Sequence, residues 1–181
     1  DTKTLKFVVR TNTECKFSYR SSIFKEKGDE IILSATLLLA KGDPKKIKQA
    51  IEEKIAYRLA RHPMEYPNVG SIFKNIPLTR IYADDTSNYA EAVRTFAFNF
   101  HGLQVPVKVD PFPVVPTAYL ISESGLKGVS FGGAMVSPKH PNFIVNVLEA
   151  KASDVKALIS LVKERVAEKF AVNLEEEVHL L

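Results

Sequence analysis

The residues most able to do chemistry stand together between Gly70 and Asn75. Ser71 offers a hydroxyl that can give up a proton, Lys74 a point charge, and Asn75 a carboxamide that both donates and accepts hydrogen bonds. Gly70 lets the backbone approach a ligand or take a turn that a side chain would forbid. The stretch indicates a segment that holds an anionic reactant. The alternative interpretation of the same pattern is a Gly-Ser turn that enters a strand, with Lys74 and Asn75 simply solvated.

Composition narrows the classes of protein to consider. The chain has 181 residues, 45% hydrophobic and 25% charged, which is typical of a soluble protein with one good core. Its most apolar run, residues 31–40, is too short to span a membrane and contains Ser34 and Thr36. The single cysteine, Cys15, can form neither an internal disulfide nor a metal cluster. We therefore expect a cytoplasmic protein without a metal site.

The net charge of +4 comes from one segment. Residues 41–61 hold seven Lys and Arg against three Asp and Glu, and the rest of the chain holds 18 of each sign. Such a segment could face nucleic acid or phosphate. It lacks the arginine-aromatic interleaving of such surfaces, however, and a lysine-rich helix face is more often simply solvated. We expect neither nucleic acid nor a membrane as a partner.

The N-terminal part of the chain is expected to contain two strands and one helix. The pattern predicts strands over residues 5–10 and 30–40. The polar segment between them is predicted to be a structured loop. Asp43 followed by Pro44 is typical of a helix start, and Pro63 is expected to end that helix. Its apolar residues recur every four positions: Ile47, Ile51, Ile55 and Leu59.

The middle of the chain gives weaker signals. Residues 88–98 are expected to form a short helix on Tyr89, Ala92, Val93 and Phe96. Four prolines over residues 105–116 favour an extended, irregular connection. Residues 117–124 are expected to form one or two helical turns that Gly125 ends.

The C-terminal part reads as two strands, a helix and a closing strand. The strands cover residues 131–136 and 142–147, and the closing strand residues 172–181. Ser153 and Asp154 are expected to cap a helix that runs to about Phe170. No GxGxxG or GxxxxGK[ST] pattern occurs, so a standard Rossmann or P-loop nucleotide site is not supported. The helix is expected to bury Val155, Leu158, Ile159, Val162, Val166 and Phe170.

Five segments, in order along the chain, resemble the UDP-N-acetylenolpyruvoylglucosamine reductase (MurB) family. They are Tyr19–Lys25, Gly70–Asn75, Leu126–Gly128, Gly132–Asn146 and Leu174–Val178. The family implies an oxidoreductase of peptidoglycan synthesis in which NADPH reduces bound FAD. The reduced flavin then passes a hydride to UDP-N-acetylglucosamine enolpyruvate, which gives UDP-N-acetylmuramate. The implied fold is α+β, a small antiparallel sheet with helices next to the end of the FAD-binding domain.

The resemblance implies three catalytic residues. Ser71 looks like the proton donor to the carbon alpha to the substrate carboxylate, with Arg20 and Glu177 as its partners at that carboxylate. Hydride addition makes an enolate-like species, and the planar fork of Arg20 suits a carboxylate that gains charge. A serine hydroxyl is a weak acid, so we expect Lys74 to lower its pKa. Glu177, protonated or bridged by water, is expected to stabilise the intermediate or restore the proton.

The resemblance also implies binding residues. Asn75 is expected to contact the substrate beside Lys74, and His140 falls where the family offers a polar substrate contact. Arg61 either reaches a phosphate or caps the C-terminal end of its own helix. A substrate-contacting tyrosine of the kind found in some family members has three candidates, Tyr82, Tyr89 and Tyr119. The expected flavin contacts are Tyr19, Arg20, Gly70 and Ser71.

The resemblance covers the later part of the family's chain. The flavin in this family is held mainly by an N-terminal half with a glycine-rich loop, and nothing before Leu5 resembles that loop. We expect residues 1–61 to end the FAD-binding domain, residues 62–170 to form the substrate domain and residues 171–181 to return to the FAD-binding domain. The missing N-terminal half is then a partner, and this chain alone is expected to bind FAD poorly and to be inactive. The alternative is a non-catalytic module that binds a nucleotide sugar.

Overall fold

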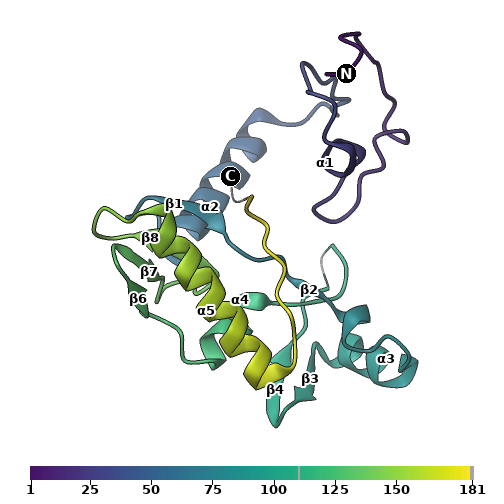
Figure 1. Ribbon diagram of the computed structural model, residues 1–181. Coiled ribbons are helices and arrows are strands. Elements are labelled where there is room, and N and C mark those ends of the chain that lie inside the picture. The colour runs from purple at the N-terminus through teal and green to yellow at the C-terminus, as the bar shows by residue number, and fades with distance from the viewer. Residues whose placement is uncertain (110, 180–181) are drawn as a thin grey trace. The chain divides into compact units, whose positions relative to one another are not determined.

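The computed structural model describes residues 1–109 and 111–179 (Figure 1). The chain divides into two compact units, Asp1–Ala50 and Ile51–Leu181. The first unit contains the short helix α1 (Ile23–Lys27) and the start of helix α2 (Pro44–Arg61). The second unit contains the sheet strands and three further α-helices, and mixes helices with antiparallel sheet as expected for an α+β fold.

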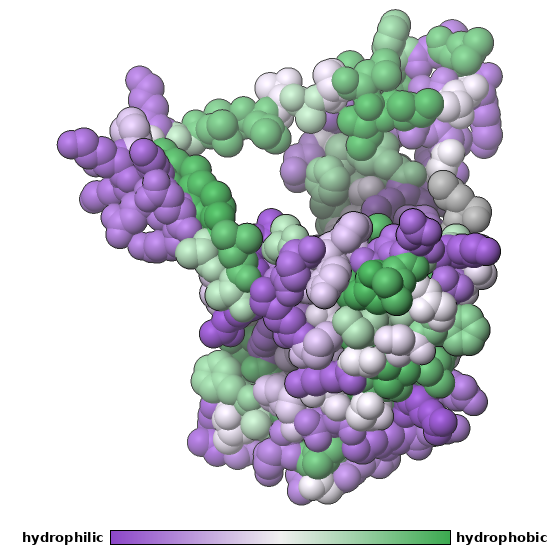
Figure 2. Space-filling view, turned by 90° about the vertical axis from the view of Figure 1, so that its left-hand side faces the viewer, coloured by the Kyte–Doolittle hydropathy of each residue, from purple (hydrophilic) through white to green (hydrophobic). Residues whose placement is uncertain are grey.

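The strands expected over residues 5–10 and 30–40 are not formed. Both segments are irregular chain without ladder partners among the described residues. Several of their apolar side chains are almost fully exposed, for example Phe7 at 90% and Leu38 at 102%. Figure 2 shows such hydrophobic surface in green. A β-strand exists only through hydrogen bonds to a neighbouring strand, so an apolar β-like sequence alone does not produce one.

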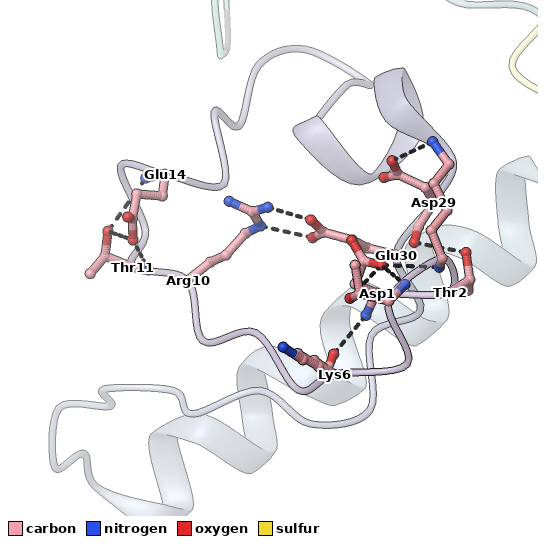
Figure 3. Close-up of polar contacts among 10 residues, drawn as sticks. Asp1, Thr2, Lys6, Arg10, Thr11, Glu14, Asp29 and Glu30 are labelled. Carbon is pink, nitrogen blue, oxygen red and sulfur yellow. Dashed lines mark hydrogen bonds and ion pairs between the residues drawn. The ribbon is translucent and has the colours of Figure 1, made fainter.

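Polar contacts, instead of pairing between strands, hold the first unit together (Figure 3). The guanidinium of Arg10 donates to both carboxylate oxygens of Glu30, with 2.8 Å between Nε and Oε2. This hydrogen bond lowers the pKa of Glu30. The backbone nitrogen and hydroxyl of Thr2 both donate to the carbonyl of Asp29, at 2.8 and 2.9 Å. A bidentate ion pair and a few hydrogen bonds thus replace the sheet ladder that the sequence predicts.

Helix α2 begins and ends where the sequence predicts. The Asp43 carboxylate accepts a hydrogen bond from the backbone nitrogen of Lys45 at 2.8 Å, and the helix ends at Arg61, two residues before Pro63. Its apolar face is not buried, because the four residues at four-residue spacing are between 49% and 56% exposed. These residues are Ile47, Ile51, Ile55 and Leu59.

The second unit is built on a four-stranded antiparallel sheet with the order β1-β8-β7-β6. The strands are β1 (Asn68–Ser71), β6 (Ser130–Phe131), β7 (Ala134–Val136) and β8 (Phe143–Asn146). The strand expected over residues 131–136 is wrong in one respect, because Gly132 and Gly133 form a tight turn that divides it into β6 and β7. A Cβ on Gly133 would lie 2.1 Å from the carbonyl oxygen of Leu148, so only glycine fits there.

Helix α5 (Ala152–Phe170) contacts β6 and β7 and supplies much of the core. Asp154 accepts hydrogen bonds from the backbone nitrogens of Lys151 and Gly133, so it fixes the helix start to the β6–β7 turn. The expected buried face is confirmed at five positions, and Val155 is only partly buried. The five buried residues are Leu158, Ile159, Val162, Val166 and Phe170.

The middle of the chain is more regular than expected. Helix α3 (Thr86–Thr95) starts earlier than predicted and ends at Thr95. Phe96 follows it with a left-handed backbone, so Phe98 belongs to β3 (Ala97–Phe100) instead. Strand β3 pairs with β4 (Leu103–Pro106). Strand β5 (Val114–Val115) lies within the stretch predicted to be irregular, and it pairs with β2 (Ile76–Pro77). Helix α4 (Thr117–Glu123) is confirmed, and the short 3-10 helix η1 covers Leu78–Arg80.

The closing strand is reduced to one bridge among the described residues. Residues 171–179 contain a single antiparallel bridge, between Glu176 and Phe73. Residues 180 and 181, the end of the expected strand, lie outside the described residues. Val172 and Leu174 in this segment are buried in the core of the second unit.

Candidate functional site

The Gly70–Asn75 segment leaves the edge of the sheet at Ser71. Gly70 has φ +88°, a left-handed backbone that favours glycine, and a Cβ there would meet nothing within 4 Å. Beyond Ser71, the backbone nitrogen of Ile72 donates to the carbonyl of Asn142 at 2.8 Å. The glycine is therefore required by conformation and leaves open space on the side where a Cβ would stand.

Asn142 holds this segment with its side chain. Its Nδ2 donates to the carbonyl of Phe73 at 2.8 Å, and its Oδ1 accepts from the nitrogen of Phe73 at 3.0 Å. Asn142 is only 4% exposed. The sequence shows this residue within a family-like segment but gives no role for it. Its one signal is a carboxamide next to the apolar run that forms β8.

The segment that carries three glutamates runs along the other side of residues 72–74. The nitrogen of Glu177 donates to the carbonyl of Ile72 at 2.7 Å, and the nitrogen of Lys74 donates to the carbonyl of Glu175 at 2.9 Å. Glu177 is thereby placed beside the residue that follows Ser71. The structure brings the backbones of these two candidate catalytic residues together, although 106 positions separate them in the sequence.

The first two glutamates have fixed partners. The Glu175 carboxylate lies 3.3 Å from Nζ of Lys74 and also contacts the guanidinium of Arg80. The Glu176 carboxylate lies 2.8 Å from Nζ of Lys163 on α5, and this hydrogen bond lowers the pKa of Glu176. Lys74 was expected to assist Ser71, and its ammonium group is paired with the Glu175 carboxylate. Neither Glu175 nor Arg80 was singled out in the sequence.

Asn75 contacts the start of α4. Its Oδ1 accepts a hydrogen bond from the nitrogen of Thr117 at 3.2 Å, and the Thr117 hydroxyl donates to the carbonyl of Lys74 at 2.6 Å. Thr117 is fully buried. The carboxamide oxygen thus serves the fold by satisfying a helix N-terminus. From the sequence, Asn75 was expected to be either a substrate contact or a solvated side chain, and its contact with α4 was not predicted.

His140 lies in a ring cluster with His62 and Phe143. Its ring centroid is 5.1 Å from that of His62 and 4.8 Å from that of Phe143, both edge-on, while His62 stacks on Phe143 at 5.1 Å. Among the described residues, the Nδ1 atoms of both histidines are buried without a hydrogen-bond partner. Because this unpartnered nitrogen of His140 is buried, the polar substrate contact expected of the residue stays a prediction.

Burial and nearby cations keep the two histidines neutral. Burial, and then the neighbouring His62, lower the pKa of His140 from 6.5 to about 4. Burial lowers the pKa of His62 as well, followed by the positive charges of Arg58, Lys139 and Lys108. Lys139 also donates to the carbonyl of Leu59 at 2.9 Å, near the C-terminal end of α2. The cluster therefore sits in a positive field without carrying charge itself at neutral pH.

Arg61 is the last residue of α2 and directly precedes His62 of this cluster in the sequence. Its guanidinium lies 4.6 Å above the ring of Tyr57, one helical turn earlier, and donates to the Tyr57 hydroxyl at 3.4 Å. The residue is exposed. Both expectations, that Arg61 caps its helix or that it reaches a phosphate, stay predictions.

Tyr19 and Arg20 belong to the first unit. They form a tight turn closed by Ser18 and Ser21, whose backbones exchange hydrogen bonds at 3.1 and 3.2 Å. Arg20 has φ +57° and an exposed side chain, with its guanidinium 5.4 Å from the Tyr19 ring centroid. The expected meeting of Arg20 with Ser71 and Glu177, which lie in the second unit, stays a prediction.

Among residues 1–109 and 111–179, no helix combines the length and apolar character that a membrane crossing requires. The same residues contain no group of three or more His, Cys, Asp or Glu placed to hold a metal ion.

Comparisons with known proteins place the chain in a family. The family model for the C-terminal domain of UDP-N-acetylenolpyruvoylglucosamine reductase matches residues 62–181, more than half of the chain. The reductase of that name from Thermosipho melanesiensis is 36% identical over 168 residues, which are 93% of this chain and 46% of that protein. The one from Carboxydothermus hydrogenoformans is 39% identical over 168 residues, 93% of this chain and 43% of that protein.

A solved structure is also similar. The crystal structure of the Thermus caldophilus UDP-N-acetylenolpyruvylglucosamine reductase (MurB) aligns with a TM-score of 0.47 and 26% identity, over 77% of this chain and 36% of that one. The chain spans less than half the length of the curated relatives named above. On the match of the family model to residues 62–181, the chain belongs to the UDP-N-acetylenolpyruvoylglucosamine reductase family and corresponds to its C-terminal part.

Proposed function

We propose that this chain carries the substrate-binding and proton-donating part of an NADPH-dependent, FAD-mediated reductase. The substrate is UDP-N-acetylglucosamine enolpyruvate and the product is UDP-N-acetylmuramate, a precursor of peptidoglycan. The observation that supports the proposal most is the 2.7 Å hydrogen bond from Glu177 to Ile72, which brings the backbone of Glu177 next to Ser71. The family resemblance assigns catalytic roles to both residues.

Ser71 is the proposed general acid. Its hydroxyl donates a proton to the carbon alpha to the substrate carboxylate, a step that general acids accelerate by about 100- to 10,000-fold. Bound FAD supplies the hydride that it has received from NADPH. Glu177 supports Ser71 from the neighbouring segment, either by stabilising the enolate-like intermediate or by restoring the serine proton.

Arg20 is the proposed partner of the substrate carboxylate. Negative charge grows on the carboxylate oxygens as the hydride arrives, and a guanidinium can donate two parallel hydrogen bonds to them. Its side chain lies in the Ser18–Ser21 turn and is exposed. Tyr19 in the same turn is proposed to contact the flavin.

Positive charge supports binding of the substrate's diphosphate. Arg58, Lys108 and Lys139 lie close enough to His62 to lower its pKa, so the surroundings of the histidine pair favour an anion. Arg61 is proposed to reach a phosphate from the end of α2. His140, which is neutral at pH 7, is proposed to make a polar contact to the uncharged part of the substrate.

The residues around Ser71 could contact one edge of the flavin ring but not the rest of the cofactor. Gly70 offers open space where a side chain would stand, so a flat ring can approach the backbone there. The sequence contains no glycine-rich phosphate loop for the rest of the cofactor. We propose that residues 1–61 complete a FAD-binding domain supplied mainly by another segment, that residues 62–170 form the substrate domain and that residues 171–181 return to the FAD-binding domain. The proposed compartment is the cytoplasm.

A chimera tests the complete reaction. The part of the Thermosipho melanesiensis reductase that precedes the aligned region would be joined to this chain, and NADPH oxidation would be followed with the enolpyruvyl substrate. The proposal predicts a yellow protein and substrate-dependent turnover, whereas this chain alone stays colourless with added FAD. A folded, yellow chimera that oxidises NADPH without forming UDP-N-acetylmuramate would contradict it.

The alternative is a module that binds a nucleotide sugar without catalysis. The family model that matches residues 62–181 is that of a C-terminal domain, and the alternative assigns sugar binding to this domain by itself. It predicts that the isolated chain binds the sugar nucleotide as tightly as the chimera does, and that Ser71→Ala leaves every measurable property unchanged.

A further inference from the structure

The segment that follows α5 has to place Glu177 without the support of a full strand. Helix α5 ends at Phe170, and Ala171 turns the chain with a left-handed backbone at φ +52°. Among the described residues from 171 onward, the only sheet-like pairing is the bridge between Glu176 and Phe73. Other contacts must therefore define where Glu177 lies.

Three ion pairs hold the two residues directly before Glu177. Arg80 at the end of η1 and Lys74 both contact the Glu175 carboxylate. Lys163 from α5 contacts the Glu176 carboxylate at 2.8 Å. Adjacent glutamates are thus attached to different elements, so the segment is clamped from two directions.

We propose that Arg80 and Lys163 are positioning residues, which hold Glu177 beside Ser71 by fixing Glu175 and Glu176. The consequence for catalysis rests on the proposed function. The clamp itself does not, because it follows from contacts within this chain.

The clamp is expected to act locally. All five side chains are partly exposed, and exposed ion pairs contribute little to the stability of a whole domain. The segment they hold has few main-chain hydrogen bonds, so a small contribution changes how often it opens. The loss of one ion pair is expected to raise local opening by about two- to fivefold, which corresponds to the usual range for such pairs.

Amide hydrogen exchange on this chain reads the opening directly. The amides of Glu177 and Lys74 bond across the clamped segment, whereas the amide of Ile72 bonds to Asn142 on the opposite side. Arg80→Gln and Lys163→Gln are expected to speed exchange at Glu177 and Lys74 and to leave Ile72 unchanged. Arg80→Lys should restore slow exchange. Arg94→Gln, which breaks an exposed ion pair with Glu91 on α3, is the matched control and should change none of the three.

Two results would overturn the clamp. One is unchanged exchange at Glu177 in the Arg80→Gln, Lys163→Gln double variant. The other is equal acceleration at Ile72, which would mean that the ion pairs stabilise the whole unit. Because exchange needs no substrate, failure of sugar binding with an intact clamp would contradict the proposed function alone.

The catalytic consequence is read in the chimera by a double-mutant cycle. Arg80→Gln is expected to lower kcat by about two- to fivefold in the native background. It should have no further effect in a Glu177→Gln background, because the residue it positions is already altered. The same loss in both backgrounds would show that Arg80 does not act through Glu177.

Discussion

The backbone nitrogen of Glu177 donates a hydrogen bond to the carbonyl oxygen of Ile72 across 2.7 Å. Ile72 in turn donates its own N–H to Asn142 across 2.8 Å. The residue after Ser71 is therefore held between the start of β8 on one side and the C-terminal segment on the other. Three segments far apart in the sequence define the surroundings of one hydroxyl.

Ser71→Ala tests the proposed general acid. In the chimera, this change should lower kcat by about 100- to 10,000-fold, because the proton donor is lost while the contacts that bind substrate remain. Reduction of the flavin by NADPH should continue at its normal rate, as measured by stopped-flow absorbance.

Ser130→Ala on β6 is the matched control, since Ser130 is an exposed serine whose hydroxyl donates to the carbonyl of Gly128. A Ser71→Ala enzyme with turnover close to that of the control would show that another group supplies the proton.

Asn142→Ala tests the support beneath the candidate site. It leaves the nitrogen and carbonyl of the buried Phe73 without their partners, and each unsatisfied buried group costs about 1–3 kcal/mol. We expect the free energy of unfolding in urea to fall by about 2–4 kcal/mol. Asn99→Ala, at an exposed turn where the side chain accepts from Gly102, serves as the control. Equal losses in the two variants would refute the supporting role.

Asn75 can be tested for its two roles separately. Asn75→Ala removes the acceptor for the Thr117 N–H and should cost about 1 kcal/mol of stability, as helix caps do. Asn75→Asp keeps that acceptor next to a helix N-terminus and should retain most of the stability. It removes the amide donor and adds negative charge, so it should weaken binding of the sugar nucleotide in calorimetry. Unchanged binding by Asn75→Asp would remove Asn75 from the substrate site.

His140 predicts a pH dependence of stability. Its pKa in the folded chain is about 4, below the ordinary 6.5, so folding favours the neutral ring. The stabilisation is complete above about pH 6.5 and is lost as the pH falls toward 4. Each pKa unit corresponds to about 1.36 kcal/mol. Because the ring is partly exposed, we expect a loss of about 1–2 kcal/mol in that range after allowing for solvent screening.

Urea midpoints between pH 6.5 and 5 measure this loss in a range above the pKa values of the paired carboxylates. His140→Gln should flatten the slope, and the same change at exposed His101 should not. An unaltered slope in His140→Gln would show that the ring does not resist protonation.

Local signals in the sequence were sufficient for the helices. Asp43 and Pro63 mark the two ends of α2, and the spacing of apolar residues identifies the buried face of α5. These features depend on neighbours a few positions away. Strands were less predictable, because the apolar residues 5–10 and 30–40 find no partner among the described residues, and because Gly132 and Gly133 form a turn inside an apparent strand.

The candidate site was only partly predictable. The family resemblance singled out Ser71 and Glu177, whose backbones the fold brings together. The supporting residues Asn142, Thr117 and Arg80 were not identified, because each acts through a partner at least 42 positions distant. No local period or spacing reveals such contacts.

Calorimetric titration of this chain with UDP-N-acetylglucosamine enolpyruvate tests the central claim most directly. The account predicts saturable binding that UDP-N-acetylmuramate competes for, that Asn75→Asp weakens and that Arg94→Gln leaves unchanged, without any need for FAD. A folded chain that shows no saturable binding of the sugar nucleotide would contradict the claim that this part of the reductase holds the substrate.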